Sequence, residues 1–426
     1  MKTKFKIFVV VLISLSGLKI NAQSKQLKSG DYLYNHFQYY EALNKYLEAE
    51  SLMEESDYEL NRKIAHTYEK LNDYDNAAIW YEKIMGYKDL DYPDEILHYA
   101  KILCGIEQYE KAKLFYKKYY ELIGLPEKYA FYESMCDWAI LNKDNVKNIP
   151  ITKTNLNIGG KSLGYTWFKE GLIFAKPFLS VYTEQTVYYD LAYAKKLEVG
   201  KFDNGVELQG NINQKYYEAS PFITKDNKHL YFASNATTIE KYKDKQLKKQ
   251  EVELSSMGVN VLKIYRAEWN GAQWINKVEL PFNNKEYDCL YPALSDDGNT
   301  LYFVSNMPGG LGGFDIYKVV RDKAGNWSEP INLKEINTPF DEIAPFIDGN
   351  TLYFSSKGHK GFGGYDIFKT NINSIEINNL GKPFNSSRDD FAFILTPDKK
   401  TAFLSSNRES KNGNDVVFEL SLSNIP

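Results

Sequence analysis

Cysteine is scarce in this chain, with three residues among 426. Secreted domains that depend on disulfides for their stability carry more, so the count excludes a disulfide-stapled scaffold. Cys104 and Cys136 both lie in helical sequence in neighbouring units, and they are either bridged or ordinary small core residues. Cys289 has no evident partner in the sequence.

Patterns that carry known chemistry are also missing. The five histidines show no HExxH spacing, which excludes a zincin metalloprotease. The sequence contains no GxSxG nucleophile elbow and no CxxC pair for zinc. It therefore predicts no enzyme activity, no metal and no cofactor. A hydrolase or lyase whose acids converge only on folding stays as a further alternative.

Long apolar runs are absent beyond the N-terminus. Three lysines precede the apolar run Phe5 to Leu15, and the small residue Ala22 follows at the distance of a cleavage site. This pattern predicts a secretory signal peptide over residues 1–22. The alternative is an uncleaved membrane anchor, which the shortness of the run disfavours. No later stretch reaches the length of a membrane span, so the mature chain is expected to have no transmembrane segment.

An excess of positive charge is absent as well. The formal net charge is −4, and cleavage after residue 22 removes four lysines and no acid, which leaves −8. Nucleic-acid-binding domains present a basic face. The charge balance therefore argues against nucleic acid as a partner.

What the sequence does contain is two systems of internal repeats. In residues 24–143 a Tyr-x-x-Ala-x-x-x-Tyr pattern begins at Tyr39, Tyr74 and Tyr109, so its period is 35 residues. One helix earlier, a small residue recurs with the same period at Gly30, Ala65 and Ala100. Small residues let two antiparallel helices approach, and the tyrosines fill the space between hairpins. The period and pattern resemble the tetratricopeptide family, with a capping helix at the end; a plain amphipathic bundle is the alternative.

The tetratricopeptide resemblance implies a concave surface made by the first helix of each pair. The positions of this chain that match the groove positions of the family are Asp31, Tyr34, Arg62, His66, Glu69 and Lys101. We expect them to form a groove for a peptide or protein. The alternative is that they cover a solvated helix face.

After a linker over residues 144–160, the chain changes to glycine-rich, alternating aromatic and β-branched sequence. The clearest units are "SPFITKDNKHLYFASN" from 220, "YPALSDDGNTLYFVSN" from 291, "APFIDGNTLYFSSK" from 344 and "FAFILTPDKKTAFLSSN" from 391, after a degenerate copy at 164–176. Each unit reads as four antiparallel strands of about 50 residues in total. The sequence therefore predicts a five-bladed β-propeller over residues 161–426, and a multidomain fold that joins an α-solenoid to an all-β domain.

A glycine loop recurs in these units as "GGFDIYK" and "GGYDIFK". It could bind an anion, or it could form a hairpin turn whose aspartate accepts backbone N–H groups. No Lys-Ser/Thr follows, and four of five units carry the aspartate, so the structural interpretation is favoured. The residues of this blade motif are Gly312, Gly313, Asp315, Gly363, Gly364, Asp366 and Asp415.

The second unit has a polar insertion, "TTIEKYKDKQLKKQEVELSSMG", over residues 237–258. Its lysines include Lys243, Lys245, Lys248 and Lys249. They could dock a partner or an anionic surface. A disordered, solvated loop is the alternative.

The stretch "SDDGNTLYFVSN…GGFDIYK" is similar to the TolB-type propeller repeat. Tetratricopeptide repeats before such a propeller, behind a signal peptide, resemble the front half of the PorE-like, OmpA-family periplasmic proteins of type IX secretion and gliding. Those proteins usually continue into a carboxypeptidase-regulatory-like domain and a peptidoglycan-binding OmpA domain, whereas this chain stops at Pro426.

This resemblance implies a periplasmic scaffold or adaptor associated with the outer membrane. Its implied partners are an outer-membrane β-barrel protein of the PorP/SprF type, an OmpA-domain protein, or both. The alternative is a propeller that senses or binds a glycan, a peptidoglycan fragment or another small ligand.

Overall fold

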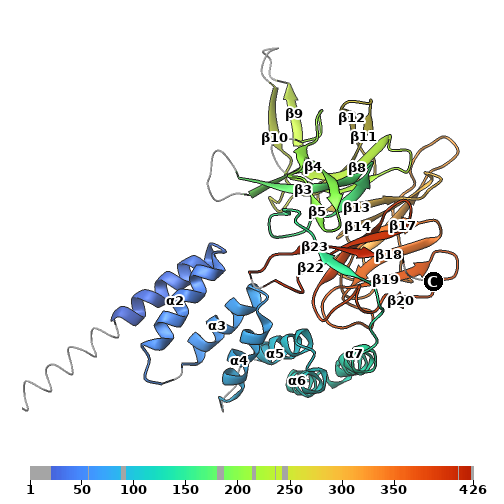
Figure 1. The fold of residues 1–426 in the computed structure, drawn as a ribbon. Helices are drawn as coiled ribbons and strands as arrows, with labels where there is room; N and C mark the ends of the chain where they lie inside the picture. The colour runs from blue at the N-terminus through green and yellow to red at the C-terminus, as the bar shows by residue number, and fades with distance from the viewer. Residues whose placement is uncertain are drawn as a thin grey trace, which may run out of the picture. The chain divides into compact units, whose positions relative to one another are not determined.

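The computed structural model describes residues 21–55, 57–87, 93–179, 187–213, 217–235, 237–241, 248–410 and 412–423 (Figure 1). The chain divides into two compact units: residues up to Ile140 with the segment Ser410–Asn414, and Leu141–Glu409 with Asp415–Pro426. The first unit is built of helices and the second of β-sheets, so the predicted fold class is confirmed. The predicted signal peptide lies, but for its last two residues, outside the described ranges.

The helical unit consists of antiparallel helix pairs. Residues 21–35 form its first described helix. The others are α2 (Tyr39–Ser51), α3 (Tyr58–Lys70), α4 (Tyr74–Met85), α5 (Pro93–Gly105), α6 (Tyr109–Leu122), the 3₁₀ turn η1 (Pro126–Lys128) and α7 (Tyr129–Asn142). In the described ranges, none of the helices combines the length and the hydropathy that crossing a bilayer requires.

The 35-residue pattern explains how these helices pack. Ala42, Ala77 and Ala112 are fully buried, and Tyr46 and Tyr81 at the end of the motif are at most 2% exposed. A Cβ atom on Gly30 would lie 2.6 Å from the ring of Tyr46, so the small residue makes room for the tyrosine. The repeated tyrosines therefore fill the space that the repeated small residues leave.

The loop inside each helix pair has the same backbone conformation in three copies. Phe37, Asn72 and Glu107, again 35 residues apart, have φ values of 61°, 60° and 59°. After Asn72, the N–H of Asp73 donates to the carbonyl of Tyr68 at 3.0 Å, which is the Schellman pattern of a helix C-terminus. The period of the sequence is thus also the period of the turn geometry.

The second unit is a five-bladed β-propeller, whose blades are five sheets of mostly four antiparallel strands. The first blade consists of β2 (Tyr165–Phe168), β3 (Gly171–Leu179), β4 (Val187–Glu198), β5 (Lys201–Phe202) and β6 (Val206–Glu207), and the second of β7 (Glu218–Ile223), β8 (His229–Asn235), β11 (Leu262–Trp269) and β12 (Trp274–Glu279). The third blade consists of β13 (Cys289–Leu294), β14 (Thr300–Ser305), β15 (Asp315–Val320) and β16 (Ile331–Asn332), and the fourth of β17 (Glu342–Asp348), β18 (Thr351–Ser356), β19 (Asp366–Asn371) and β20 (Asn378–Asn379). The fifth blade consists of β21 (Asp390–Leu395), β22 (Thr401–Ser406), β23 (Val416–Ser421) and β1 (Ile151–Lys153).

The first strand of four blades carries a β-bulge at the same place. The register with the second strand shifts there, and one non-glycine residue adopts a left-handed conformation. These residues are Ser220, Tyr291, Ala344 and Ala392, with φ between 49° and 53°. Together with Gly164 they line a small cavity between the five first strands. The bulges therefore fix the backbone that surrounds the propeller axis.

The ring is closed by a strand from the start of the unit. β1 pairs antiparallel with β23 and forms the fourth strand of the last blade, with Ile151 opposite Leu420. Residues 151–153 lie in the stretch that the sequence assigns to a linker. Three residues of β1 therefore belong to the propeller, where they cover the edge of β23.

The insertion of the second blade contains a β-hairpin. β9 (Thr237–Lys241) pairs with β10 (Lys248–Val252), and Lys248 lies opposite Lys241 in the register. The described part of the insertion thus consists of two paired strands, and whether it docks a partner stays a prediction. Lys243 and Lys245 lie outside the described residues.

Candidate functional site

Five polar residues of the helices α3 and α5 contact one another on one face of the helical unit. Arg62, His66 and Glu69 are spaced by about one turn along α3, and Glu95 and His98 by one turn along α5. His66 Nε2 lies 2.8 Å from Glu95 Oε2, and His98 Nδ1 lies 3.0 Å from Glu69 Oε2. We call these five residues the histidine face.

The buried tyrosine Tyr81 of the 35-residue repeat contacts two residues of the histidine face. Tyr81, which is fully buried, donates its hydroxyl hydrogen to Glu69 at 2.7 Å. The ring of Tyr81 also stacks on His98, with a centroid distance of 6.3 Å and an interplanar angle of 7°. A residue predicted for packing therefore also positions two residues of the face.

The charges of the histidine face compensate one another. Burial acts to raise the pKa of Glu69, but the hydrogen bonds from His98 and Tyr81 outweigh it and hold that pKa below its usual range. The hydrogen bond to Glu69 raises the pKa of His98 against the opposing effect of burial. Both shifts favour an imidazolium next to a carboxylate. Glu95 is 3% exposed and is hydrogen-bonded to His66. Its Oε1 atom also lies 3.8 Å from Arg62 Nη1.

The remaining residues predicted for the groove lie around this face. Burial raises the pKa of Tyr34, and the neighbouring Tyr39 and Glu69 raise it further. The ring of Tyr34 packs edge-on against that of Tyr39, with 5.2 Å between the ring centroids. Lys101 is exposed on α5. Asp31 instead accepts the hydroxyl of Tyr46 at 2.8 Å and pairs with Lys63 at 2.5 Å. Tyr34, Arg62, His66 and Glu69 are thus brought together, whereas Asp31 connects the first three helices.

Glu95 and His98 are the members of the face that the repeat pattern did not find. A strict period of 35 leads from His66 to Lys101. His98 lies about one turn, and Glu95 about two turns, before Lys101 in α5. The signal that could have found them is the Glu-x-x-His spacing itself, which places an acid and an imidazole on the same helix side.

The glycine loops of the propeller have the capped geometry of a turn. Asp315 accepts the N–H groups of Leu311 and Gly312, the latter at 2.9 Å, and the side-chain amide of Asn332 at 2.7 Å. A Cβ atom on Gly312 would overlap the carbonyl oxygen of Phe340, so only glycine fits there. With Asp315 1% exposed, its oxygens face donors of its own blade. This geometry is that of a structural cap.

The other blades repeat or vary this cap. Asp366 accepts the N–H of Phe362 at 2.8 Å and that of Gly363 at 3.4 Å. Asp415 instead accepts the N–H of Ser162 at 2.9 Å, at the start of the first blade. The second glycines of the two loops, Gly313 and Gly364, lie against the side chains of Asp341 and Asp389.

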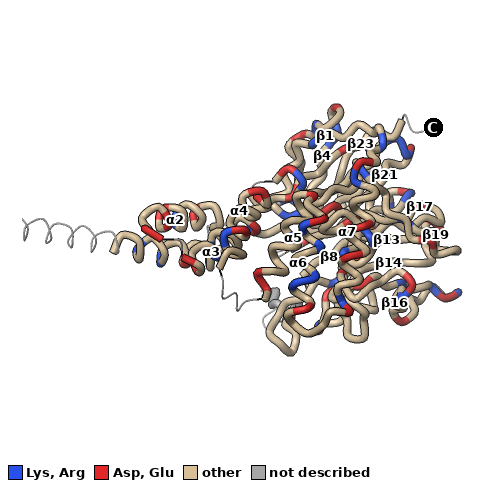
Figure 2. Tube along the Cα trace, turned by 90° about the horizontal axis from the view of Figure 1, so that it is seen from below, with Lys and Arg blue, Asp and Glu red and all other residues tan. Residues whose placement is uncertain are grey.

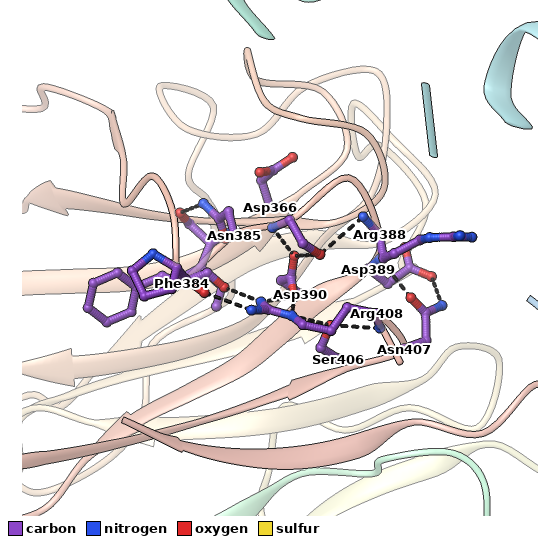
Figure 3. A network of polar contacts seen from close by, with 12 residues as sticks. Asp366, Phe384, Asn385, Arg388, Asp389, Asp390, Ser406, Asn407 and Arg408 are labelled. Atoms are coloured by element: carbon purple, nitrogen blue, oxygen red, sulfur yellow. Dashed lines mark hydrogen bonds and ion pairs between the residues drawn. The ribbon is translucent and has the colours of Figure 1, made fainter. Parts of the chain in front are cut away.

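A polar network next to these loops joins the last two blades (Figure 3). Arg408 pairs with the fully buried Asp390 and donates to the carbonyls of Pro383 and Phe384, each at 2.7 Å. Burial raises the pKa of Asp390 although Arg408 acts to lower it. Asn407 donates to Asp389 at 3.0 Å. The hydrogen bonds of these groups go to one another, which is the pattern of a structural network.

Three further features concern metal binding, the cysteines and the distribution of charge. In the described part of the chain, no group of three His, Cys, Asp or Glu side chains is placed to hold a metal ion. Cys104 and Cys136 are free thiols whose sulfur atoms lie 3.9 Å apart. Basic and acidic residues are interspersed along both units (Figure 2).

Comparison with known proteins gives a distant structural likeness. No protein-family model and no curated protein matches the chain. TolB from Acinetobacter baumannii aligns over 64% of this chain and 54% of its own, with 13% identity and a TM-score of 0.33. A putative TolB from Agrobacterium tumefaciens aligns over 61% and 79%, with 12% identity and a TM-score of 0.36. A thermostable family-43 glycoside hydrolase aligns over 62% and 91%, with 12% identity and a TM-score of 0.38.

The alignment therefore spans about half of the first TolB chain, 54% of its length. At such low identities and TM-scores, the activities of these proteins do not transfer to this chain. The candidate sites of this chain are those that its own residues form: the histidine face and a cavity of about 580 Å³ lined by residues of all five blades of the propeller.

Proposed function

We propose that this protein is a non-enzymatic scaffold that binds a protein partner through the histidine face. The observation that carries the proposal is the pairing of His66 with Glu95 and of His98 with Glu69 across two helices. The side chains of Arg62, His66 and His98 are 34%, 22% and 37% exposed, so fixed donors and acceptors remain open to a partner. A pre-positioned polar surface lowers the entropy cost of binding.

We further propose that the scaffold works in the periplasm at the outer membrane. The support is the signal-peptide pattern and the order of the repeats, which resembles periplasmic proteins of type IX secretion and gliding. The proposed partner is an outer-membrane β-barrel protein of the PorP/SprF type, an OmpA-domain protein, or both. A gene for such a protein beside this one would add support.

Affinity purification from detergent-solubilised membranes tests the scaffold function. We expect the wild type to recover an outer-membrane barrel or OmpA-domain protein. The double variant Arg62→Ala/His66→Ala should recover at least about tenfold less, because both groups pair with Glu95 on the face. Lys117→Ala, on the exposed side of α6, is the matched control. Recovery that is equal for all three proteins, or of cytoplasmic proteins alone, contradicts the proposal.

A second candidate function is the binding of a glycan, a peptidoglycan fragment or another small ligand by the propeller. The observation that favours it is a cavity of about 580 Å³ at one end of the propeller. Its volume lies in the usual range of small-molecule sites. Saturation-transfer NMR with muropeptides tests this candidate, and the absence of any signal contradicts it for that ligand class.

A further inference from the structure

The propeller cavity is lined by residues of all five blades. Its rim consists of the hairpin turns between the first and second strands, which contribute Lys169, Lys225, Asp296, Asp348 and Lys399. Each blade thus presents one turn to the same space.

The charges of the rim neutralise one another between blades. Lys225 Nζ lies 2.6 Å from Asp296, and Lys399 Nζ lies 2.6 Å from Asp348. Both lysines are more than 60% exposed, so these ion pairs are screened by salt and can open at little cost. The rim therefore offers little net charge to a ligand.

The wall between the second and third blades is different. Arg266 of β11 and Arg321, directly after β15, line the cavity next to Tyr231 of β8. Tyr231 is 2% exposed, and its hydroxyl lies 3.5 Å from Arg321 Nη2. Burial raises the pKa of Tyr231, and the positive charges of Arg321 and Arg266 act against that shift. Arg266, Arg321 and Tyr231 thus line the same part of the cavity.

The hydrogen-bonding capacity of the two arginines is only partly used. Arg321 stacks on Trp327 at 4.3 Å, and among the described residues its buried Nε atom has no hydrogen-bond partner and no carboxylate pairs with it. Arg266 pairs with Glu268 through its Nη2 atom, at 3.1 Å from Oε1. A buried donor without an acceptor is rare in folded proteins, so the hydrogen-bonding capacity of the Arg321 guanidinium is not fully used by the protein's own groups.

We propose that Arg266 and Arg321 bind the carboxylate of a sugar acid in the propeller cavity. A guanidinium matches a carboxylate in geometry and charge. Trp167 lines the same cavity and gives an aromatic surface for a sugar ring. The proposal rests on the second candidate function, ligand binding by the propeller, and is independent of the histidine face.

D-glucuronate and D-glucose are the probes, because they differ only in the carboxylate at C6. Calorimetry and saturation-transfer NMR at low ionic strength measure their binding to the full chain. We expect glucuronate to bind at least about tenfold more tightly than glucose. Arg321→Gln should weaken glucuronate binding about tenfold and leave glucose unchanged. Lys323→Gln, an exposed lysine two residues later, is the matched control and should bind as the wild type does.

Three other outcomes would each overturn a different part of the proposal: the carboxylate contact, the sugar ring or the whole assignment. Equal binding of both sugars, insensitive to Arg321→Gln, overturns the carboxylate contact but leaves the cavity as a sugar site. Acetate that competes as strongly as glucuronate itself overturns the sugar ring as part of the ligand. Failure of both sugars at saturating concentration overturns the sugar-acid assignment outright. If Arg321→Gln unfolds, as circular dichroism would show, Arg266→Gln takes its place with the same expectations.

Discussion

Asp315 determines the conformation of the glycine loop before β15. It is 1% exposed and accepts the N–H groups of Leu311 and Gly312 and the amide of Asn332. Alanine at this position leaves these partly buried donors without the carboxylate that accepts from them. We therefore expect Asp315→Ala to lower the free energy of unfolding by about 3 kcal/mol, measured by urea denaturation.

Asp322→Ala is the matched control for this prediction. Asp322 also caps a turn, with the N–H of Ala324 at 2.8 Å and that of Asn326 at 2.9 Å, but the turn is exposed and water can replace the carboxylate. Its effect should be clearly smaller. An Asp315→Ala protein as stable as the wild type would contradict the structural role of the aspartate.

The thiol of Cys289 should be unreactive in the folded protein. Its side chain is fully buried, and burial raises the pKa of the thiol to about 12, so the thiolate is rare at neutral pH. We expect iodoacetamide to leave Cys289 unmodified in the native chain and to modify it in guanidinium chloride, as read by peptide mass spectrometry. Equal modification in both conditions would show that the blade opens at this strand.

Residue roles were predictable where a residue recurs. Asp315 and Asp366 follow the same glycines in two units, and a cap is a role that every blade needs. Glu95 and His98 occur once, outside the 35-residue phase, so periodicity carries no information on them. The cavity arginines Arg266 and Arg321 come from different blades, and their proximity arises only on folding.

At the scale of elements, the pairing of α3 with α5 should appear in histidine titrations. The pKa of His98 is raised by Glu69, so the ion pair is complete below the ordinary histidine pKa and is lost as the pH rises through the higher value in the folded chain. We expect NMR titration to place the His98 midpoint above that of a free histidine. Glu69→Gln should move the midpoint back down.

His359 is the internal control in the same spectra. Burial lowers the pKa of His359, which contacts the carbonyl of Ile336 at 2.7 Å in the propeller. Its midpoint should lie below that of His98 and should not respond to Glu69→Gln. A His98 midpoint that stays unchanged in the variant would mean that Glu69 does not hold the imidazolium.

Most elements could be predicted from the sequence, and the exceptions have physical reasons. Helix pairs and four-strand units recur with their hydrophobic pattern, which a single sequence displays. β1 has three residues, Ile151–Lys153, which is too short for any period, and its partner β23 lies more than 260 positions later in the chain. The left-handed residues of the bulges, such as Ser220 and Tyr291, differ in type, so residue identity does not mark them in the sequence.

At the scale of the whole molecule, the propeller depends on its closing strand. β1 covers the edge of β23 in the last blade. A propeller fragment that begins at residue 155 lacks β1, and we expect it to melt at a lower temperature and to aggregate more than a fragment that begins at residue 144. Differential scanning calorimetry and light scattering measure both effects. Equal melting temperatures would show that the ring does not need the strand.

Site-specific photo-crosslinking in cells tests whether the helical unit binds a protein partner through the histidine face. A benzophenone amino acid at position 101 lies on the exposed side of α5 beside the face, and one at position 117 lies on α6. We expect a crosslinked outer-membrane protein from position 101 and none from position 117. Crosslinks of equal yield from both positions, or from position 117 alone, would contradict it.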